Sequence, residues 1–152
     1  MRRAIEALWV HFSFVAILLV VACSGENGRT SACDGLEYSS IGLTREEYIP
    51  CVGEIMMVMD ELVVQLEENF AGEKEAHSRA RRTYRELKVL VRKAGGRNLL
   101  EGWEDSHLNE LNINLMNAYF GYGAAVLARS RSDFENARRN HDQARMIYDV
   151  LS

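Results

Sequence analysis

The sequence predicts an all-α fold, a four-helix bundle built from two αα-hairpins, over residues 44–152 of the 152-residue chain. Four stretches carry apolar residues at spacings of three and four, which is the period of one helix face. No stretch combines the alternating pattern of a strand with flanking turn residues, and Pro50 is the only proline. Helices joined by short turns account for both observations.

The first helix is expected at residues 44–69. The segment Thr44–Glu47 fits a capping box, and Leu43 and Tyr48 are placed as a hydrophobic staple. Pro50 conflicts with this start, because a proline inside a helix removes a backbone donor and kinks the chain. A fresh start at Pro50 is therefore the alternative. The expected inward face is Val52, Ile55, Met59, Leu62, Leu66 and Asn69 or Phe70.

Three further helices are expected at residues 73–94, at residues 107–129 and from a cap at Ser132 or Asp133 to the C-terminus. Gly95 and Gly96 end the first of these, as glycine does at many helix C-termini. The residues expected to face inward are Ala76, Ala80, Tyr84, Leu87, Leu90 and Val91, then Leu108, Leu111, Leu115, Ala118, Tyr119, Tyr122, Ala125 and Val126, and finally Phe134, Ala137, His141, Ala144, Ile147, Tyr148 and Leu151.

Charge predicts which helices are neighbours. Residues 44–70 carry seven acidic residues and one basic residue, whereas residues 73–97 carry nine basic and three acidic residues. Opposite charges favour these helices as an antiparallel pair, although each exposed ion pair contributes only ~0–1 kcal/mol. We interpret the basic run Arg79–Arg82 as a solvated face opposite those acids. A site for lipid phosphates or another polyanion is the alternative.

A weak internal repeat raises the question of duplication. Residues 77–87 and 141–151 share His, Ala, Arg, Tyr and Leu at an offset of 64, which Phe70 and Phe134 also obey. Duplication of one hairpin and coincidence both stay open. Residues 133–144 also resemble the second half of a tetratricopeptide repeat, which implies a helical scaffold as an alternative function. The resemblance lacks its partner motifs, and tetratricopeptide arrays repeat at about 34 residues.

The first 23 residues have the organisation of a signal peptide. The basic pair Arg2-Arg3 precedes an apolar stretch from Leu8 to Ala22, with a small residue before the expected cut. The ending Val20-Val21-Ala22-Cys23 resembles the lipobox of bacterial lipoproteins. That resemblance implies cleavage after Ala22, a diacylglycerol on the Cys23 sulfur and an acyl chain such as palmitate on the new amino terminus.

The same resemblance implies a location in the cell. Ser24 in place of Asp points to the periplasmic face of the outer membrane in a host that has one. The alternative is an uncleaved membrane span, but the 15 residues from Leu8 to Ala22 fall short of the ~20 that a span requires. We therefore expect a protein that is lipid-anchored in the bacterial cell envelope.

The expected mature chain, residues 23–152, begins with a tether and an irregular segment over residues 23–43. The Gly- and Ser-rich stretch 24–32 would have an r.m.s. span of ~15–18 Å. Cys33 and Cys51 form an even pair in an oxidising compartment, so we predict a disulfide between them. Closing that loop would contribute ~3 kcal/mol. Two free thiols are the alternative.

Composition argues against several functions. Loss of Arg2, Arg3 and Glu6 with the signal leaves a net charge of −5, and an acidic exported chain is a poor partner for nucleic acid. No nucleophile-elbow, P-loop, dinucleotide-binding or zinc-protease motif occurs, so we expect no enzyme, no catalytic residue and no cofactor. The expected function is a non-enzymatic interaction or accessory role with a protein partner in the envelope.

A ligand-, haem- or metal-binding bundle is the alternative function. His77 and His141 are its weak candidates, because paired inward histidines in a helical bundle can hold a haem or a metal. Met56 or Met59 with His141 would repeat the ligand topology of periplasmic b-type four-helix cytochromes. A single Glu-x-x-His spacing at residues 104–107 falls short of the two that di-iron sites need. A second candidate is a pocket along the small residues 121–125, where close helix packing is the default expectation.

Overall fold

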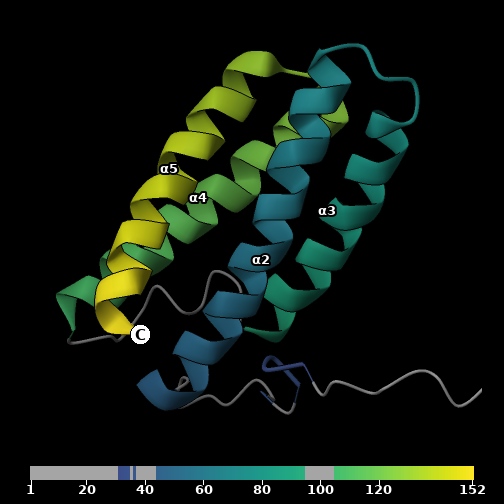
Figure 1. Ribbon diagram of the computed structural model, residues 1–152. Helices are drawn as coiled ribbons and strands as arrows, with labels where there is room; N and C mark the ends of the chain where they lie inside the picture. Colours follow the sequence, from purple (N-terminus) through teal and green to yellow (C-terminus); the bar gives the residue numbers. More distant parts are fainter. Residues whose placement is uncertain (1–30, 35, 37–43, 95–104) are drawn as a thin grey trace, which may run out of the picture. The chain divides into compact units, whose positions relative to one another are not determined.

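The computed structural model describes residues 31–34, 36, 44–94 and 105–152, which belong to one compact unit, Ser31–Ser152. The described residues of this unit form four helices: α2 (Arg45–Phe70), α3 (Ala76–Lys93), α4 (Ser106–Ala128) and α5 (Arg131–Leu151). Figure 1 shows them packed side by side, so the predicted all-α four-helix bundle is confirmed. Among the described helices, none combines the length and the apolar character that crossing a membrane requires.

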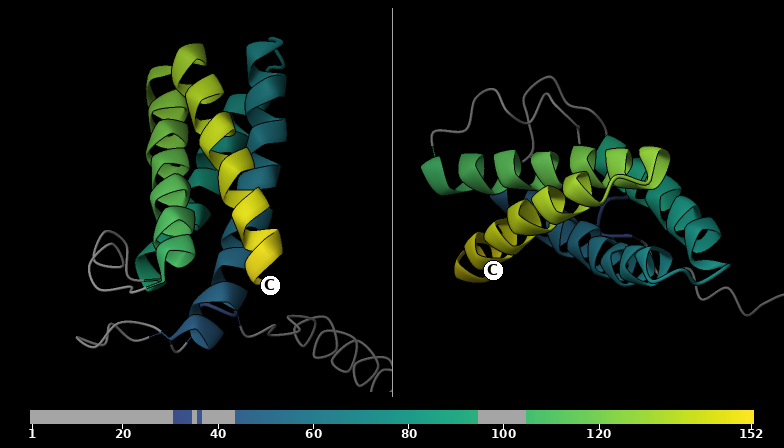
Figure 2. Two further views of the ribbon diagram at one scale, coloured as in Figure 1. Left: turned by 90° about the vertical axis from the view of Figure 1, so that its left-hand side faces the viewer. Right: turned by 90° about the horizontal axis from the view of Figure 1, so that it is seen from above.

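The chain forms two hairpins, α2 with α3 and α4 with α5, as predicted. The helix α2 contacts all three of the others, whereas α3 and α5 do not contact each other. These two lie on opposite sides of the bundle in Figure 1, so α2 and α4 are the inner pair. Seen from above in Figure 2, α4 and α5 meet at their connecting turn and diverge away from it.

The start of α2 follows the expected capping box. Thr44 Oγ1 accepts from the Glu47 backbone N–H, and Glu47 Oε2 accepts from the Thr44 N–H at 2.9 Å. These bonds from Thr44 hold the pKa of the Glu47 carboxyl below its ordinary value. Pro50 lies inside the continuous helix, so the alternative of a fresh start at Pro50 is wrong. Leu43, one half of the expected staple, lies outside the described residues.

The other helix ends differ slightly from the prediction. The turn at Gly72, whose φ is 93°, delays α3 to Ala76. Arg129 ends α4 in the left-handed conformation, with φ 52° and ψ 37°. Ser130 caps α5 by accepting from the Asp133 N–H at 3.3 Å, so the expected cap at residue 132 or 133 was wrong. The left-handed residue reverses the chain early enough for Ser130 to become the cap.

The inward faces agree closely with the periodicity. Met57 is 65% exposed while Met56 is buried, as their positions on the helix indicate. The buried apolar residues of the four helices include Val52, Ile55, Met59, Leu62, Leu66, Ala80, Leu87, Leu108, Leu111, Leu115, Tyr122, Val126, Phe134, Ala137, Ala144 and Ile147.

Three glycines allow helices to approach closely. A Cβ on Gly121 would lie 2.8 Å from the Ala137 Cβ, which explains why α4 and α5 meet near their turn. A Cβ on Gly53 would lie 2.5 Å from the Tyr148 hydroxyl, and one on Gly123 would overlap the Tyr84 hydroxyl. Ala137 and Tyr84 thus fill the space along residues 121–125 where a pocket was the alternative.

The tyrosine contacts bear on the internal repeat. Tyr84 of α3 covers a glycine of α4, and Tyr148 of α5 covers a glycine of α2. The two hairpins therefore touch each other through equivalent tyrosine–glycine contacts. The offset of 64 nevertheless places the turn at residues 71–75 opposite residues 135–139, which lie inside α5. The helix boundaries of the two hairpins therefore do not coincide at that offset.

Truncating either tyrosine should loosen the contact between the hairpins. Removing a core aromatic costs about 3–5 kcal/mol, and these half-buried side chains should each cost about 2–3 kcal/mol on mutation to Ala. Urea unfolding of Tyr84→Ala and Tyr148→Ala measures the change. Val150→Ala, at a residue 80% exposed, is the control and should change stability by less than about 0.5 kcal/mol. If both tyrosine variants lost no more stability than Val150→Ala, the proposed role of Tyr84 and Tyr148 in joining the hairpins would be contradicted.

Candidate functional site

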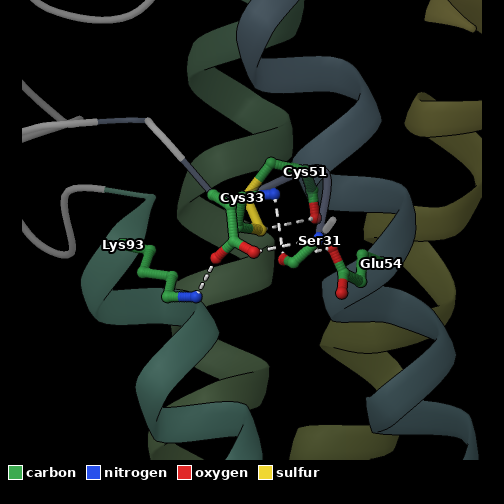
Figure 3. Close-up of a disulfide and its surroundings, with 6 residues drawn as sticks. Ser31, Cys33, Cys51, Glu54 and Lys93 are labelled. Atoms are coloured by element: carbon green, nitrogen blue, oxygen red, sulfur yellow. Dashed lines mark hydrogen bonds and ion pairs between the residues drawn. A yellow bond between two sulfur atoms is a disulfide. The ribbon is translucent and has the colours of Figure 1, made fainter. Parts of the chain in front are cut away.

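A disulfide fastens the segment before α2 to the bundle. The bond joins Cys33 to Cys51, whose Cα atoms lie 4.7 Å apart, and both residues are fully buried. Figure 3 shows this link together with the polar contacts around it. The predicted pairing is therefore confirmed. Cys23, the expected lipid anchor, lies outside the described residues, so its lipidation stays a prediction.

Two polar contacts hold the same segment. Ser31 Oγ donates to Glu54 Oε2 of α2 at 2.7 Å. Asp34 forms an ion pair with Lys93, the last residue of α3. The Lys93 ammonium and the backbone N–H of Ser31 lower the pKa of the Asp34 carboxyl from its ordinary value. Residues 31–34 are therefore held beside the beginning of α2 and the end of α3.

A buried polar cluster links three helices. His141 of α5 is 3% exposed, and its Nδ1 lies 3.0 Å from the hydroxyl of Tyr122 on α4. Its Nε2 lies 3.4 Å from Arg145 Nη2. Arg145 in turn pairs with Asp60 of α2 at 2.6 Å. Both ring nitrogens of His141 thus have protein partners.

The surroundings of His141 disfavour its protonated form. Arg145 can only donate, so an Nε2 that accepts from it leaves Nδ1 as the N–H that donates to Tyr122. Burial lowers the pKa of His141 below its ordinary value, and the Arg145 charge lowers it further. The carboxylates of Asp60 and Asp142 oppose this shift. Burial also raises the pKa of the Tyr122 hydroxyl.

The two candidate histidines, His77 and His141, are not brought together. His77 lies on α3 and His141 on α5, two helices that do not contact each other. Met56 and Met59 are buried in the core. His107 is exposed, and residue 104 lies outside the described residues. Within the part of the chain that the structure describes, no three His, Cys, Asp or Glu side chains gather as a metal site would need.

The acids of α2 pair mainly with α5. We expected them to face the bases of α3, and the two helices are indeed neighbours. Among the described residues, however, a single ion pair joins α2 to α3, and it lies near their turn. Two pairs of an arginine with an acid join α2 to α5, and His141 Nε2 also lies 3.7 Å from Asp60 Oδ1. The pairs are Glu68–Arg79 with α3, and Asp60–Arg145 and Glu67–Arg138 with α5.

Sequence reasoning missed a second buried hydrogen bond. The Tyr48 hydroxyl of α2 donates to Asn112 Oδ1 of α4 at 3.0 Å, and both residues are at most 1% exposed. Burial raises the pKa of Tyr48. Asn112 follows the inward Leu111, and its polar side chain gave no signal that its position is buried. The bond stabilises the contact between the two inner helices.

One open pocket of about 300 Å³ lies near the turns, between the end of α2 and the start of α5. Two of its lining residues are Phe70 and Phe134, whose ring centroids are 5.5 Å apart. Its charged lining residues are Glu67, Arg131, Glu135 and Arg138. Glu67 pairs with Arg138, and Arg131 lies 3.8 Å from Glu135, so each charged side chain of the lining has an opposite charge beside it.

Comparison with known proteins identifies no relative of the chain. No protein-family model matches the chain, and no significant match arises among curated proteins or solved structures. The fold class and the contacts above are therefore the basis for interpreting the function.

The disulfide should be detectable and stabilising. Digestion without reduction, followed by mass spectrometry, should recover a Cys33–Cys51 linked peptide that disappears after reduction. Reduction should lower the free energy of unfolding by about 3 kcal/mol, because the open chain regains loop entropy when it unfolds. Alkylation of both thiols in unreduced protein would contradict the pairing.

Stability should fall as the pH drops below about 6.5. The folded-state pKa of His141 is lowered, so the unfolded chain takes up the proton first and stability is lost as the pH falls through and below the ordinary histidine value of 6.5. His77 contributes in the same direction. His141→Gln should reduce this pH dependence in thermal unfolding, while His107→Gln, at an exposed residue, should keep it. Equal pH profiles for wild type and His141→Gln would exclude the buried histidine as a cause.

Proposed function

We propose that the protein is a lipoprotein of the bacterial cell envelope with a non-enzymatic interaction or accessory role. The observation that carries the proposal is the agreement of two features in different parts of the chain. The ending Val20-Val21-Ala22-Cys23 resembles a lipobox. The Cys33–Cys51 disulfide is a bond that persists in exported proteins and is rare in the reducing cytosol.

The attachment of the segment before α2 supports an anchored domain. Residues 31–34 are held by a buried disulfide, by Glu54 of α2 and by Lys93 of α3. A lipid on Cys23 would therefore connect through a short tether to a firmly fixed point on the bundle. By the lipobox resemblance, Ser24 favours an anchor at the periplasmic face of the outer membrane where the host has one.

The use of the polar side chains supports an accessory role. The His141 cluster and the α2–α5 ion pairs join helices to one another. His141, the more deeply buried of the two histidine candidates, has protein partners at both nitrogens. A bundle whose internal polar groups serve packing is suited to present its outer surface to a partner protein.

Replacing Cys23 should abolish lipidation. Cys23→Ala removes the sulfur that would carry the diacylglycerol, so metabolic labelling with a palmitate analogue should give no labelled band. Cys33→Ala, which leaves the lipobox intact, is the matched control and should keep its label. Labelling of Cys23→Ala at the wild-type level would remove the basis for the anchor.

The accessory role is tested by purification of the lipidated protein from its own membrane after cross-linking. A partner recovered in stoichiometric amount would support the role. A Soret band or a stoichiometric metal in the purified protein would instead favour the ligand-binding bundle.

A further inference from the structure

The outward side of α3 carries a continuous row of basic side chains. Arg81, Arg85, Lys88 and Arg92 follow one another at spacings of four, three and four residues, so they share one helix face. All four are exposed, and Arg82 is exposed beside them. We call these five residues the α3 basic face. The helix carries one acidic residue, Glu86.

The charges of this face are not neutralised within the bundle. Among the residues that the structure describes, none of the five forms an ion pair with an acid. Arg79, which the sequence grouped with them, is different because it pairs with Glu68 and Glu73 at 2.7 Å. The acids of α2 that were expected opposite this face include Asp60 and Glu67, which pair with α5 instead.

The tether joins the bundle at one end of this face. Asp34 pairs with Lys93, the residue that follows Arg92. Ten residues lead from Cys23 to Cys33, so the attachment point lies within ~35 Å of the anchoring lipid at full extension. The 18 residues of α3 span ~27 Å. The α3 basic face is therefore within reach of the headgroups of the membrane that holds the anchor.

We infer that the α3 basic face binds the anionic phospholipid surface of that membrane, an inference that rests on the proposed lipid anchor. Basic residues near an anionic leaflet are attracted to it within about a Debye length. The acids of the bundle are concentrated on α2 and the charges of α5 are balanced, so an anionic surface attracts the α3 basic face and repels the acidic face of α2. Val89, which is 54% exposed among the bases, adds an apolar side chain at the headgroup boundary.

Bound in this way, the domain has one orientation on the membrane. The helix α5 lies on the opposite side of the bundle from α3 and does not contact it. With α3 against the headgroups, α5 faces away from the membrane, where a partner protein can approach it. The α3 basic face thus acts as a positioning surface for the domain.

Vesicle co-sedimentation of the unlipidated Ser31–Ser152 unit tests the inference. This unit contains the described core, so it can be produced without residues 1–30. We expect it to sediment at low ionic strength with vesicles of mixed phosphatidylglycerol and phosphatidylcholine but not with pure phosphatidylcholine. Added salt should release it, because exposed charges are screened. Arg85→Gln/Lys88→Gln should weaken the binding about 10- to 30-fold.

A control variant with the same change in net charge shows whether binding depends on where the basic residues lie or only on the total charge. Arg131→Gln/Arg139→Gln removes the same charge from α5 and leaves the α2–α5 ion pairs intact, so it should bind like wild type. Circular dichroism verifies that both variants are folded. Equal weakening by the two variants, or no binding of the wild type to anionic vesicles, would overturn the inference.

Binding to soluble polyglutamate without binding to vesicles would also overturn it, because the face would then belong to an acidic protein partner. These outcomes are independent of the anchor. Palmitate labelling of Cys23 reports on the proposed function, whereas vesicle binding by the unlipidated unit reports on the α3 basic face alone.

Discussion

Every other helix packs against α2, and this requirement shapes the rest of the bundle. A helix with three neighbours needs a wide apolar surface, so Met56 is buried beside the regular stripe that runs from Val52 to Leu66. The flexible side chain of methionine suits such a position because it adapts to irregular gaps. The other inner helix, α4, has Glu110 as its only residue of the types Asp, Glu, Lys and Arg. The two outer helices are amphipathic, since each is covered on one side only.

Apolar spacing and cysteine count were sufficient to predict the four helices, most of the core and the Cys33–Cys51 disulfide. Periodicity describes one helix at a time, and this explains what it missed. It does not show which of two neighbours a charged face will meet, so the α2–α5 ion pairs and the Tyr48–Asn112 bond were not foreseen. The cap at Ser130 was missed for a local reason, because Arg129 adopts a left-handed conformation that usually indicates glycine.

The two outer helices differ in charge, because the acidic side chains of α2 pair mainly with α5 and, among the described residues, leave most of the basic side chains of α3 unpaired with an acid. The basic residues of α5 are balanced by its own acids and by those of α2, whereas α3 carries seven basic residues and one acid. The sequence alone suggested that α2 would neutralise α3. The bundle instead has an acidic helix inside, a balanced helix on one side and a basic helix on the other. The net charge of the chain therefore does not indicate the local charge of any one face of the bundle.

The position of the disulfide determines how the domain would respond to a mechanical load. Tension applied to the chain ahead of Cys33 passes through the sulfur–sulfur bond to Cys51 and enters α2 in its second turn. The residues between the two cysteines form a loop that carries none of this force. The capping box at Thr44 and Glu47 lies inside that loop, so pulling does not peel the helix from its first hydrogen bonds. The force reaches a part of α2 that is already buried against its neighbours, and the bundle resists as a whole.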